Sequence, residues 1–295
     1  MIKNPQTKGY LFALAAAFTA TNTYFASKHI LNFVTVFQFG ILWYGFGLFY
    51  NSVYLTVTGK VRETFTFSFK AFLMLLVFAV LEVISTTCFF TAIKLVDNPA
   101  IVSFLVNLSP ALVTLLGMLL LKEKFSLREG LGIILAITGA FLISFKWSLN
   151  IHSLFVTGSE LVLISVLCLS LNVIIAKKYI SELKPQLLAI TRVIGLFTFS
   201  LIAISFSKDT FSFPKEAVVF AMYGALVGPF FGAYAQYFAL KYIPASKAMI
   251  IQSSKSFLIL FMAFFVLGLW PLWIQVVGGV LTITGIILVT VKLKK

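Results

Sequence analysis

Two stretches of this sequence repeat one another. GLGIILAITGAFLISFK (130–146) aligns without a gap to VVGGVLTITGIILVTVK (276–292), an offset of 146 residues. Gly132 meets Gly278, and Gly139 meets Gly285. Because self-similarity at a fixed spacing is typical of a duplicated unit, the alignment predicts two related halves, residues 1–147 and 148–295.

Two further matches occur in the same order along the chain. Ala92-Ile93-Lys94 resembles Ala239-Leu240-Lys241, and TNTYFASKHI (21–30) resembles LNVIIAKKYI (171–180). Chance matches are common in apolar sequence, but three matches with similar spacing support a duplication that covers the whole chain.

The composition indicates the solvent in which the chain folds. Of the 295 residues, 60% are hydrophobic and 11% are charged, and the mean hydropathy is +1.04. A water-soluble domain carries about 25% charged residues, so this chain suits a lipid bilayer instead. The net charge of +14 does not predict a nucleic-acid partner, because the basic residues lie in short gaps between apolar runs.

Ten apolar segments are long enough to cross a bilayer, which takes about 20 helical residues. With five spans in each half, the second half enters the membrane upside down relative to the first. The predicted fold is an all-α integral membrane protein with ten transmembrane helices in two inverted five-helix repeats. The predicted spans are 9–29, 34–57, 69–93, 98–121, 128–146, 157–178, 185–206, 217–240, 245–268 and 271–291.

Lysine and arginine positions predict the orientation, because cytoplasmic segments carry an excess of positive charge. With a cytoplasmic N-terminus, 16 Lys and Arg residues fall in inside segments and 5 in outside segments. The distribution therefore predicts that both termini are cytoplasmic.

The sequence resembles the EamA-like branch of the drug/metabolite transporter superfamily. The resemblance is strongest over residues 92–143, which have an Ala start, Pro110, a closing Glu123 and two glycines in the next span. The second half departs from this pattern, with Ser256 in place of the proline and Leu269 in place of the acid. The resemblance implies a transporter whose central pathway is lined by the third, fourth, eighth and ninth spans.

Three charged residues lie within predicted spans, where a charge near mid-bilayer costs about 2.5–3.5 kcal/mol on insertion scales. They are Glu82, Arg192 and Lys255. Arg192 is expected to anchor the seventh span near its cytoplasmic end. For Lys255 two interpretations stand. It has a structural role, either in an ion pair with Glu82 or as a neutral, deprotonated amine, or it is a cavity-facing cation that meets an anionic group on a substrate.

Helical spacing predicts polar faces beside Lys255. Gln252, Lys255 and Ser256 share one side of the ninth span, and Ser103 and Asn107 are four residues apart in the fourth. Back-bonding to the same helix is the competing explanation for each Ser or Thr. The predicted substrate-binding residues are Lys255, Gln252, Ser256, Asn107, Ser103, Ser109, Glu82, Thr86, Phe89, Tyr234, Gln236, Asn22 and Asn172.

The eighth span contains three glycines at a spacing of four, Gly224, Gly228 and Gly232, with Pro229 beside them. This pattern favours close packing against a neighbouring helix, and a gating hinge is the alternative. For Asn22 and Asn172, at repeat-related positions, interhelical hydrogen bonds and substrate contact explain the residues equally well.

The leading hypothesis is a secondary transporter in a bacterial inner membrane that exports an amino acid or another carboxylated metabolite by alternating access. Coupling to protons through Glu82, or to a counter-substrate, is left open. The alternatives are a non-transporting structural or assembly protein and an uptake carrier for a nucleotide- or phosphate-bearing metabolite. The sequence has no GxxxxGK[ST] motif and no cluster of acids, nucleophiles or metal ligands, so neither an enzyme nor a bound cofactor or metal is expected.

Overall fold

The computed structural model describes residues 4–96, 102, 105–144, 157–207, 210–267 and 270–291. All regular elements in these ranges are helices, as predicted. The first half holds α1 (Pro5–Ile30), α2 (Val36–Val57), α3 (Val61–Thr64), α4 (Phe69–Leu95), α6 (Leu108–Leu120) and α7 (Leu127–Ser144). The second half holds α8 (Ser159–Lys178), α9 (Ile180–Leu183), α10 (Pro185–Phe206), α11 (Lys215–Ala225), the π-helix η2 (Leu226–Gly232), α12 (Ala233–Tyr242), α13 (Ala245–Gln252), α14 (Ser254–Leu267) and α15 (Trp273–Thr290).

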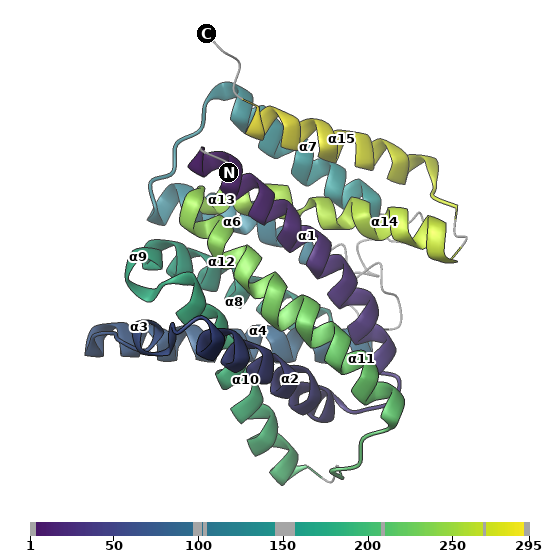
Figure 1. Ribbon diagram of the computed structural model, residues 1–295. Helices are drawn as coiled ribbons and strands as arrows, with labels where there is room; N and C mark the ends of the chain where they lie inside the picture. The colour runs from purple at the N-terminus through teal and green to yellow at the C-terminus, as the bar shows by residue number, and fades with distance from the viewer. Residues whose placement is uncertain are drawn as a thin grey trace.

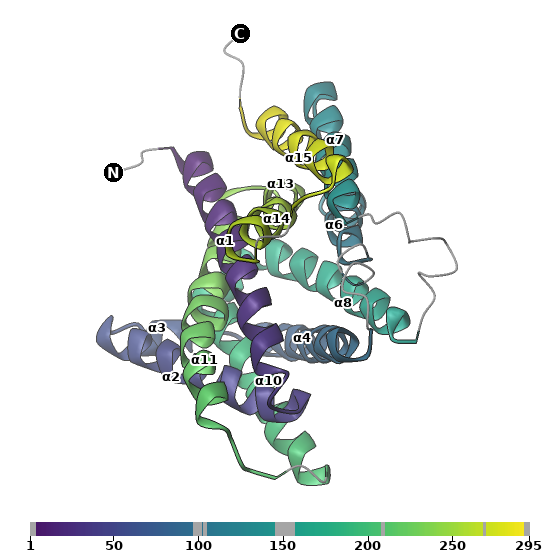
Figure 2. The same ribbon diagram turned by 90° about the vertical axis from the view of Figure 1, so that its right-hand side faces the viewer.

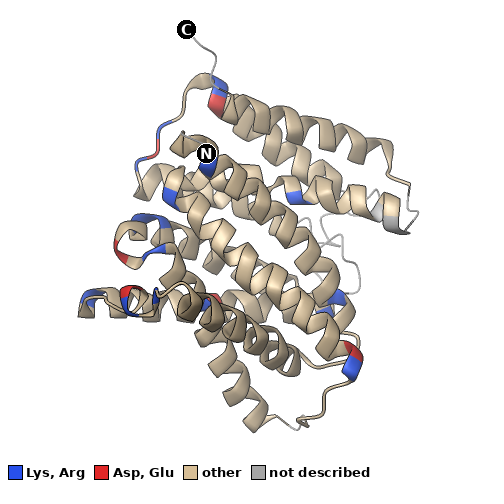
Figure 3. Ribbon diagram, in the orientation of Figure 1, with Lys and Arg blue, Asp and Glu red and all other residues tan. Residues whose placement is uncertain are grey.

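The outer surface of the bundle is apolar, as a lipid environment requires. Large hydrophobic side chains such as Phe18, Phe49, Ile134 and Phe265 are exposed. Among the described residues, six helical stretches have the length and hydropathy to cross a membrane: α4, α7, α8, α10, the continuous α11–η2–α12 and α15. Most charged residues lie near helix ends (Figure 3). The chain is thus a multi-pass membrane protein.

Helix contacts follow the predicted repeat. α1 packs against α11–η2–α12 and α13–α14, and α8 packs in the same way against α4 and α6. If each helix is replaced by its counterpart in the other repeat, the contacts of α1 become the contacts of α8. Three pairs of helices at equivalent positions in the two repeats are also in contact: α2 with α10, α6 with α13 and α7 with α15. This pattern is that of two five-helix units related by a pseudo-two-fold axis.

A glycine seam joins α7 to α15, which lie side by side in both views (Figures 1 and 2). A Cβ atom built on Gly132 would lie 2.8 Å from the Gly285 carbonyl oxygen, and one on Gly139 would lie 2.5 Å from that of Gly278. Residue numbers therefore rise along one helix as they fall along the other. The two equivalent helices are antiparallel, which confirms the inverted repeat.

Two predicted spans are interrupted at equivalent points. Turns at Asn107, before α6, and at Ser253, between α13 and α14, are 146 residues apart. Ser253 has ψ near zero (−17°), and the Ser256 amide donates to its carbonyl at 3.1 Å in a tight turn. Pro110 has no amide hydrogen to donate at the matching position. The break at Ser253 lies in the polar run QSSKS (252–256), which was interpreted as one face of a continuous span.

The eighth span widens into the π-helix η2, which contains Pro229. Its glycines allow close approach of α1 and α2. Cβ atoms on Gly224, Gly228 and Gly232 would lie 2.1 Å from Trp43 Cζ3, 2.6 Å from Thr23 Oγ1 and 2.9 Å from Thr19 Oγ1 respectively. The contacts suit the packing interpretation, and a gating role for these residues stays a prediction. The predicted boundary after residue 147 lies outside the described residues.

Candidate functional site

A cavity of about 520 Å³ lies between the two halves. It receives side chains from both repeats, including α1, α4, α8, η2 and α14. Its wall includes Ser144 at the end of α7 and Gln275 near the start of α15. These helix ends lie on the face opposite the one where α1 begins and α15 ends. The cavity thus occupies the half of the bundle remote from the termini.

The half nearest the termini is filled instead by the largest hydrophobic cluster. Leu55, Leu75, Leu187, Tyr237 and Leu240 are buried in it. Each of the four leucines lies near the end of its helix on the face where α1 begins. The structure therefore combines a hollow half with a packed half, and the boundary between them is near the middle of the bundle.

Three polar contacts reinforce the packed half. The Glu123 carboxylate accepts hydrogen bonds from the backbone amides of Ala245 (2.7 Å) and Ser246 (3.2 Å) and from the Ser246 hydroxyl. This caps the free amides at the start of α13. Lys247 pairs with Glu129. Lys177 donates to the carbonyl oxygens of Leu240 and Ile243, at 2.7 and 2.8 Å, where α12 ends.

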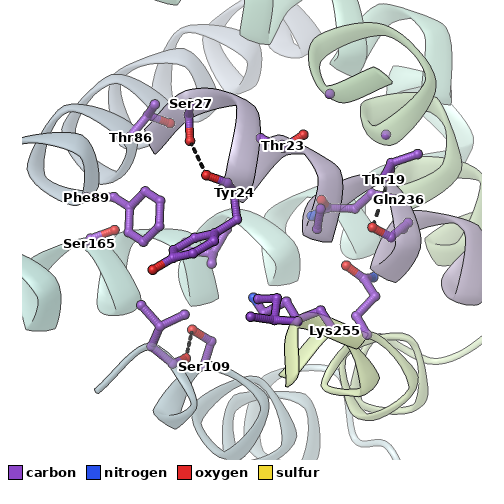
Figure 4. A pocket seen from close by; sticks show the side chains of 18 of the residues that line it. Thr19, Thr23, Tyr24, Ser27, Thr86, Phe89, Ser109, Ser165, Gln236 and Lys255 are labelled. Atoms are coloured by element: carbon purple, nitrogen blue, oxygen red, sulfur yellow. Dashed lines mark hydrogen bonds between the residues drawn. The ribbon is translucent and has the colours of Figure 1, made fainter. Parts of the chain in front are cut away.

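Lys255, in the first turn of α14, lines the cavity. Its side chain points into the open space, with Tyr24, Phe89 and Ser109 arranged around it (Figure 4). None of the ion pairs among the described residues involves Lys255. An unpaired ammonium group in a membrane protein requires water or an anionic partner within reach.

Glu82 pairs with Arg192 rather than with Lys255. The Glu82 Oε2 atom lies 3.1 Å from Arg192 Nε, and Glu82 Oε1 accepts a hydrogen bond of 3.4 Å from the Tyr237 hydroxyl. The side chain of Glu82 is 4% exposed and that of Arg192 is 25% exposed. Both residues line the cavity, so the expected anchoring role of Arg192 at the helix end is replaced by a role in the cavity wall.

The hydrogen bonds of Asn107 are made within the protein. Its Nδ2 donates to the Ala140 carbonyl and to Ser144 Oγ, both at 2.8 Å, and its Oδ1 accepts from Ser256 Oγ at 3.1 Å. Ser109 Oγ donates to the Val106 carbonyl at 2.8 Å. Asn107, Ser109 and Ser256 all line the cavity. The bonds of Asn107 and Ser256 join α6, α7 and α14, whereas Ser109 bonds back to its own segment.

Three polar atoms in the described cavity wall are buried and make no hydrogen bond: Gln252 Nε2, Thr23 Oγ1 and Arg192 Nε. Arg192 Nε faces the Glu82 carboxylate in the ion pair, so Gln252 Nε2 and Thr23 Oγ1 are the two without any partner. A buried polar group without a partner costs free energy, so such groups in a cavity indicate where a ligand or water binds. Gln252 was predicted from its spacing to Lys255. Gln236, also predicted, lines the same cavity.

Aromatic rings form much of the remaining wall. Tyr24 and Phe89 lie near one another in Figure 4, and Phe25, Trp43 and Phe90 also contribute. Phe89 was predicted, as was Thr86, which lines the cavity beside it. One charged group, a few polar atoms and several aromatic rings make the cavity suitable for a ligand with one charged end and an apolar body.

Three predicted residues lie outside the cavity wall. The Tyr234 ring packs against Tyr54 and Phe230, with centroids 5.2 and 5.3 Å apart. Asn22 donates to its own helix at the Phe18 carbonyl, 2.9 Å away. Asn172 donates to the Phe78 carbonyl on α4 at 3.2 Å, an interhelical bond. Ser103, a fourth predicted residue, lies outside the described residues.

The sequence interpretation missed the contribution of the first span. Thr19, Thr23 and Ser27 all line the cavity. Their spacing of four residues places them on one face of α1. This spacing was the available signal, whereas Asn22, which attracted attention through its repeat partner, lies on another face.

The comparisons with known proteins agree with this architecture. Residues 7–145 and 156–291 each match the model of the EamA-like transporter family. A search of curated proteins gives no match. One similar solved structure, described only as the crystal structure of a protein, has a TM-score of 0.80 at 14% identity and covers 96% of each chain. At that identity the likeness shows the fold alone.

Proposed function

Because this chain belongs to the EamA-like transporter family, we propose that it is a secondary transporter for small metabolites that carry a carboxylate or another anionic group. Amino acids and other carboxylated metabolites are the substrate classes considered first. The family supports membrane transport of small molecules, and the chemistry of the cavity supports the choice of anions.

Lys255 is the observation on which the choice of anions depends. It contributes a positive charge to the cavity, and the described residues include no ion-pair partner for it. Glu82 is already held by Arg192. A carboxylate on the substrate would therefore find a charged donor at Lys255 and a neutral donor at Gln252, one helical turn earlier.

We propose alternating access as the mechanism. The cavity is in the half of the bundle remote from the termini, while the other half is sealed by a hydrophobic cluster and by the Glu123 cap. In an inverted repeat, exchanging the conformations of the two five-helix repeats would open the sealed side of the bundle and close the side that holds the cavity. Packed halves that rearrange as units suit this exchange.

The proposed location is the bacterial inner membrane, with both termini in the cytoplasm and export as the direction. The orientation is supported by the gathering of Lys and Arg on the side where α1 begins (Figure 3). Export is supported by the family resemblance. Transport in proteoliposomes of known sidedness, loaded on one side or the other, measures the direction separately from the substrate.

A phosphate-bearing substrate is the second candidate. A phosphate group carries up to two negative charges and is usually held by several cationic donors. The cavity offers Lys255 as its one unpaired charged donor among the described lining residues. The carboxylate therefore fits the charge of the cavity better, and inorganic phosphate and a nucleotide belong in the substrate panel as competitors.

The test is transport and ligand-induced thermal stabilisation across a metabolite panel, with the wild type, Lys255→Met and Lys241→Met. Lys241 is an exposed lysine at the end of α12 and is the matched control. We expect anionic hits whose apparent affinity falls about 10- to 100-fold in Lys255→Met, as for loss of a charge-assisted hydrogen bond. Hits without anions, or equal affinity in Lys255→Met, would contradict the proposal. A folded protein that transports none of the panel would favour the structural alternative.

A further inference from the structure

The formal charge of the cavity restricts the ligand more narrowly than the word anion does. Its charged lining residues, within the described ranges, are Glu82, Arg192 and Lys255. The first two pair with each other. With Lys255 protonated, as the proposed function requires, the cavity has one uncompensated positive charge, which a single negative charge on the ligand would balance.

Glu82 is poorly placed to bind a ligand ammonium group. One of its carboxylate oxygens faces Arg192 Nε at 3.1 Å and the other accepts from Tyr237 at 3.4 Å. Its side chain is 4% exposed. Turning the carboxylate toward a ligand would leave the Arg192 charge without its partner, and a buried charge without a partner is strongly unfavourable.

An α-ammonium group would also be close to Lys255. In an α-amino acid the ammonium is attached one carbon from the carboxylate, so a carboxylate bound to Lys255 brings two positive charges within a few ångströms. Their repulsion is appreciable in a medium of reduced dielectric constant. Near Lys255 in the sequence, Gln252 Nε2 has no partner, and this donor suits a carboxylate oxygen.

The remaining wall suits an apolar or aromatic body. Tyr24, Trp43, Phe89 and Phe90 contribute rings, and the volume of about 520 Å³ accommodates a molecule with one or two rings. Stacking on these rings does not require a second charge on the ligand.

We infer that the cavity selects monocarboxylates with an apolar or aromatic body and no ammonium group over the α-amino acids of the same skeleton. The inference rests on the proposed function, since it takes Lys255 as the group that binds the carboxylate. It narrows that proposal from carboxylated metabolites in general to those with a net charge of minus one.

The experiment compares matched ligand pairs that differ by the α-ammonium group. The pairs are 3-phenylpropionate with phenylalanine, 4-methylpentanoate with leucine, and indole-3-propionate with tryptophan. Phenethylamine, which has the ring and the ammonium without the carboxylate, is the cationic control. Dissociation constants are measured by titration calorimetry on the full chain in lipid nanodiscs, for the wild type, Lys255→Met and Lys241→Met.

We expect at least one monocarboxylate to bind about tenfold or more tightly than its amino-acid partner. That binding should be lost in Lys255→Met and kept in Lys241→Met, and phenethylamine should not bind. Equal or tighter binding of the amino acids would overturn the inference. If amino-acid binding were lost in Lys255→Met, the proposed function would stand and only the further inference would fail.

Binding of both members of a pair with no effect of Lys255→Met would instead overturn the proposed function together with the inference. Binding of phenethylamine alone would do the same, because the cavity would then select cations. Failure of all six acids to bind would overturn the inference, because it names apolar monocarboxylates as the class.

Discussion

Arg192 Nε lies 3.1 Å from Glu82 Oε2 and joins α10 of the second half to α4 of the first. Tyr237 donates to the same carboxylate from α12 at 3.4 Å. Three helices therefore meet at one carboxylate in the cavity wall. Because the carboxylate is buried, the pair must be complete for either charge to be tolerated.

Breaking this pair from one side should destabilise the protein. We expect Glu82→Gln and Arg192→Met to lower the free energy of unfolding by about 3–5 kcal/mol each, because each leaves a buried charge unpaired. The double variant should recover much of the loss. Thermal unfolding in one detergent measures all three.

The Glu63–Lys184 pair is the control for that cycle. Its side chains are 66% and 37% exposed, and their closest charged atoms are 3.3 Å apart. Exposed pairs contribute little, so Glu63→Gln should have little effect on the midpoint of unfolding. A double variant at Glu82 and Arg192 that is no more stable than the single variants would contradict the assigned pairing.

Removing the polar atoms without partners should affect the ligand and leave the fold intact. We expect Thr23→Val and Gln252→Leu each to weaken binding of a transported anion about 3- to 10-fold, the value of one ordinary hydrogen bond. The unfolding midpoint should stay the same or rise, because neither atom has a partner in the protein.

Asn107→Leu should show the opposite behaviour. Its side chain makes bonds to Ala140, Ser144 and Ser256 at 2.8–3.1 Å. We expect a lower unfolding midpoint, because the substitution leaves buried partners without their bonds. An unchanged midpoint together with a large loss of affinity would instead make Asn107 a ligand-binding residue.

Gly139→Ala should disrupt the seam between α7 and α15. The added Cβ would lie 2.5 Å from two backbone atoms, the Gly278 oxygen and the Thr282 nitrogen, which cannot move as a flexible side chain does. We expect little folded protein by size-exclusion chromatography. Gly130→Ala, on the same helix with nothing within 4 Å of its Cβ, should fold normally. Equal yields of the two variants would argue against the seam.

Glu123→Gln should loosen the sealed side. The carboxylate binds the amides of Ala245 and Ser246 at 2.7 and 3.2 Å, and loss of its charge weakens both bonds. We expect hydrogen–deuterium exchange at the start of α13 to rise about tenfold or more. Glu182→Gln, at an exposed site in α9, is the control. Unchanged exchange in Glu123→Gln would show that the cap does not hold this side closed.

The apolar segments and the repeat were predictable, because each follows from a strong constraint. Backbone groups in lipid must be paired within a helix, so long apolar runs indicate spans. The glycine pattern was visible in the alignment of Gly132 with Gly278, because close helix approach tolerates few other residues. Lys255 was identified for a similar reason, because a charged residue has a high free-energy cost of insertion within a span.

The rotation of each helix about its axis was not predictable. In a soluble protein the apolar stripe marks the buried face, but a membrane helix is apolar toward lipid and core alike. The sequence therefore gave no reason to face Arg192 toward Glu82, and it placed Tyr234 and Asn22 in a cavity that they do not line. The stripe of Thr19, Thr23 and Ser27 was the exception, since hydroxyl spacing in α1 marked its cavity face.

The glycine seam also bears on the origin of the chain. Gly132 meets Gly285 and Gly139 meets Gly278, while the alignment equates Gly132 with Gly278 and Gly139 with Gly285. Each of these two glycines of α7 therefore contacts the α15 counterpart of the other one. Two separate copies of an ancestral five-helix unit, inserted in opposite senses, would meet through the same glycines, so this surface suits an antiparallel homodimer that preceded gene fusion.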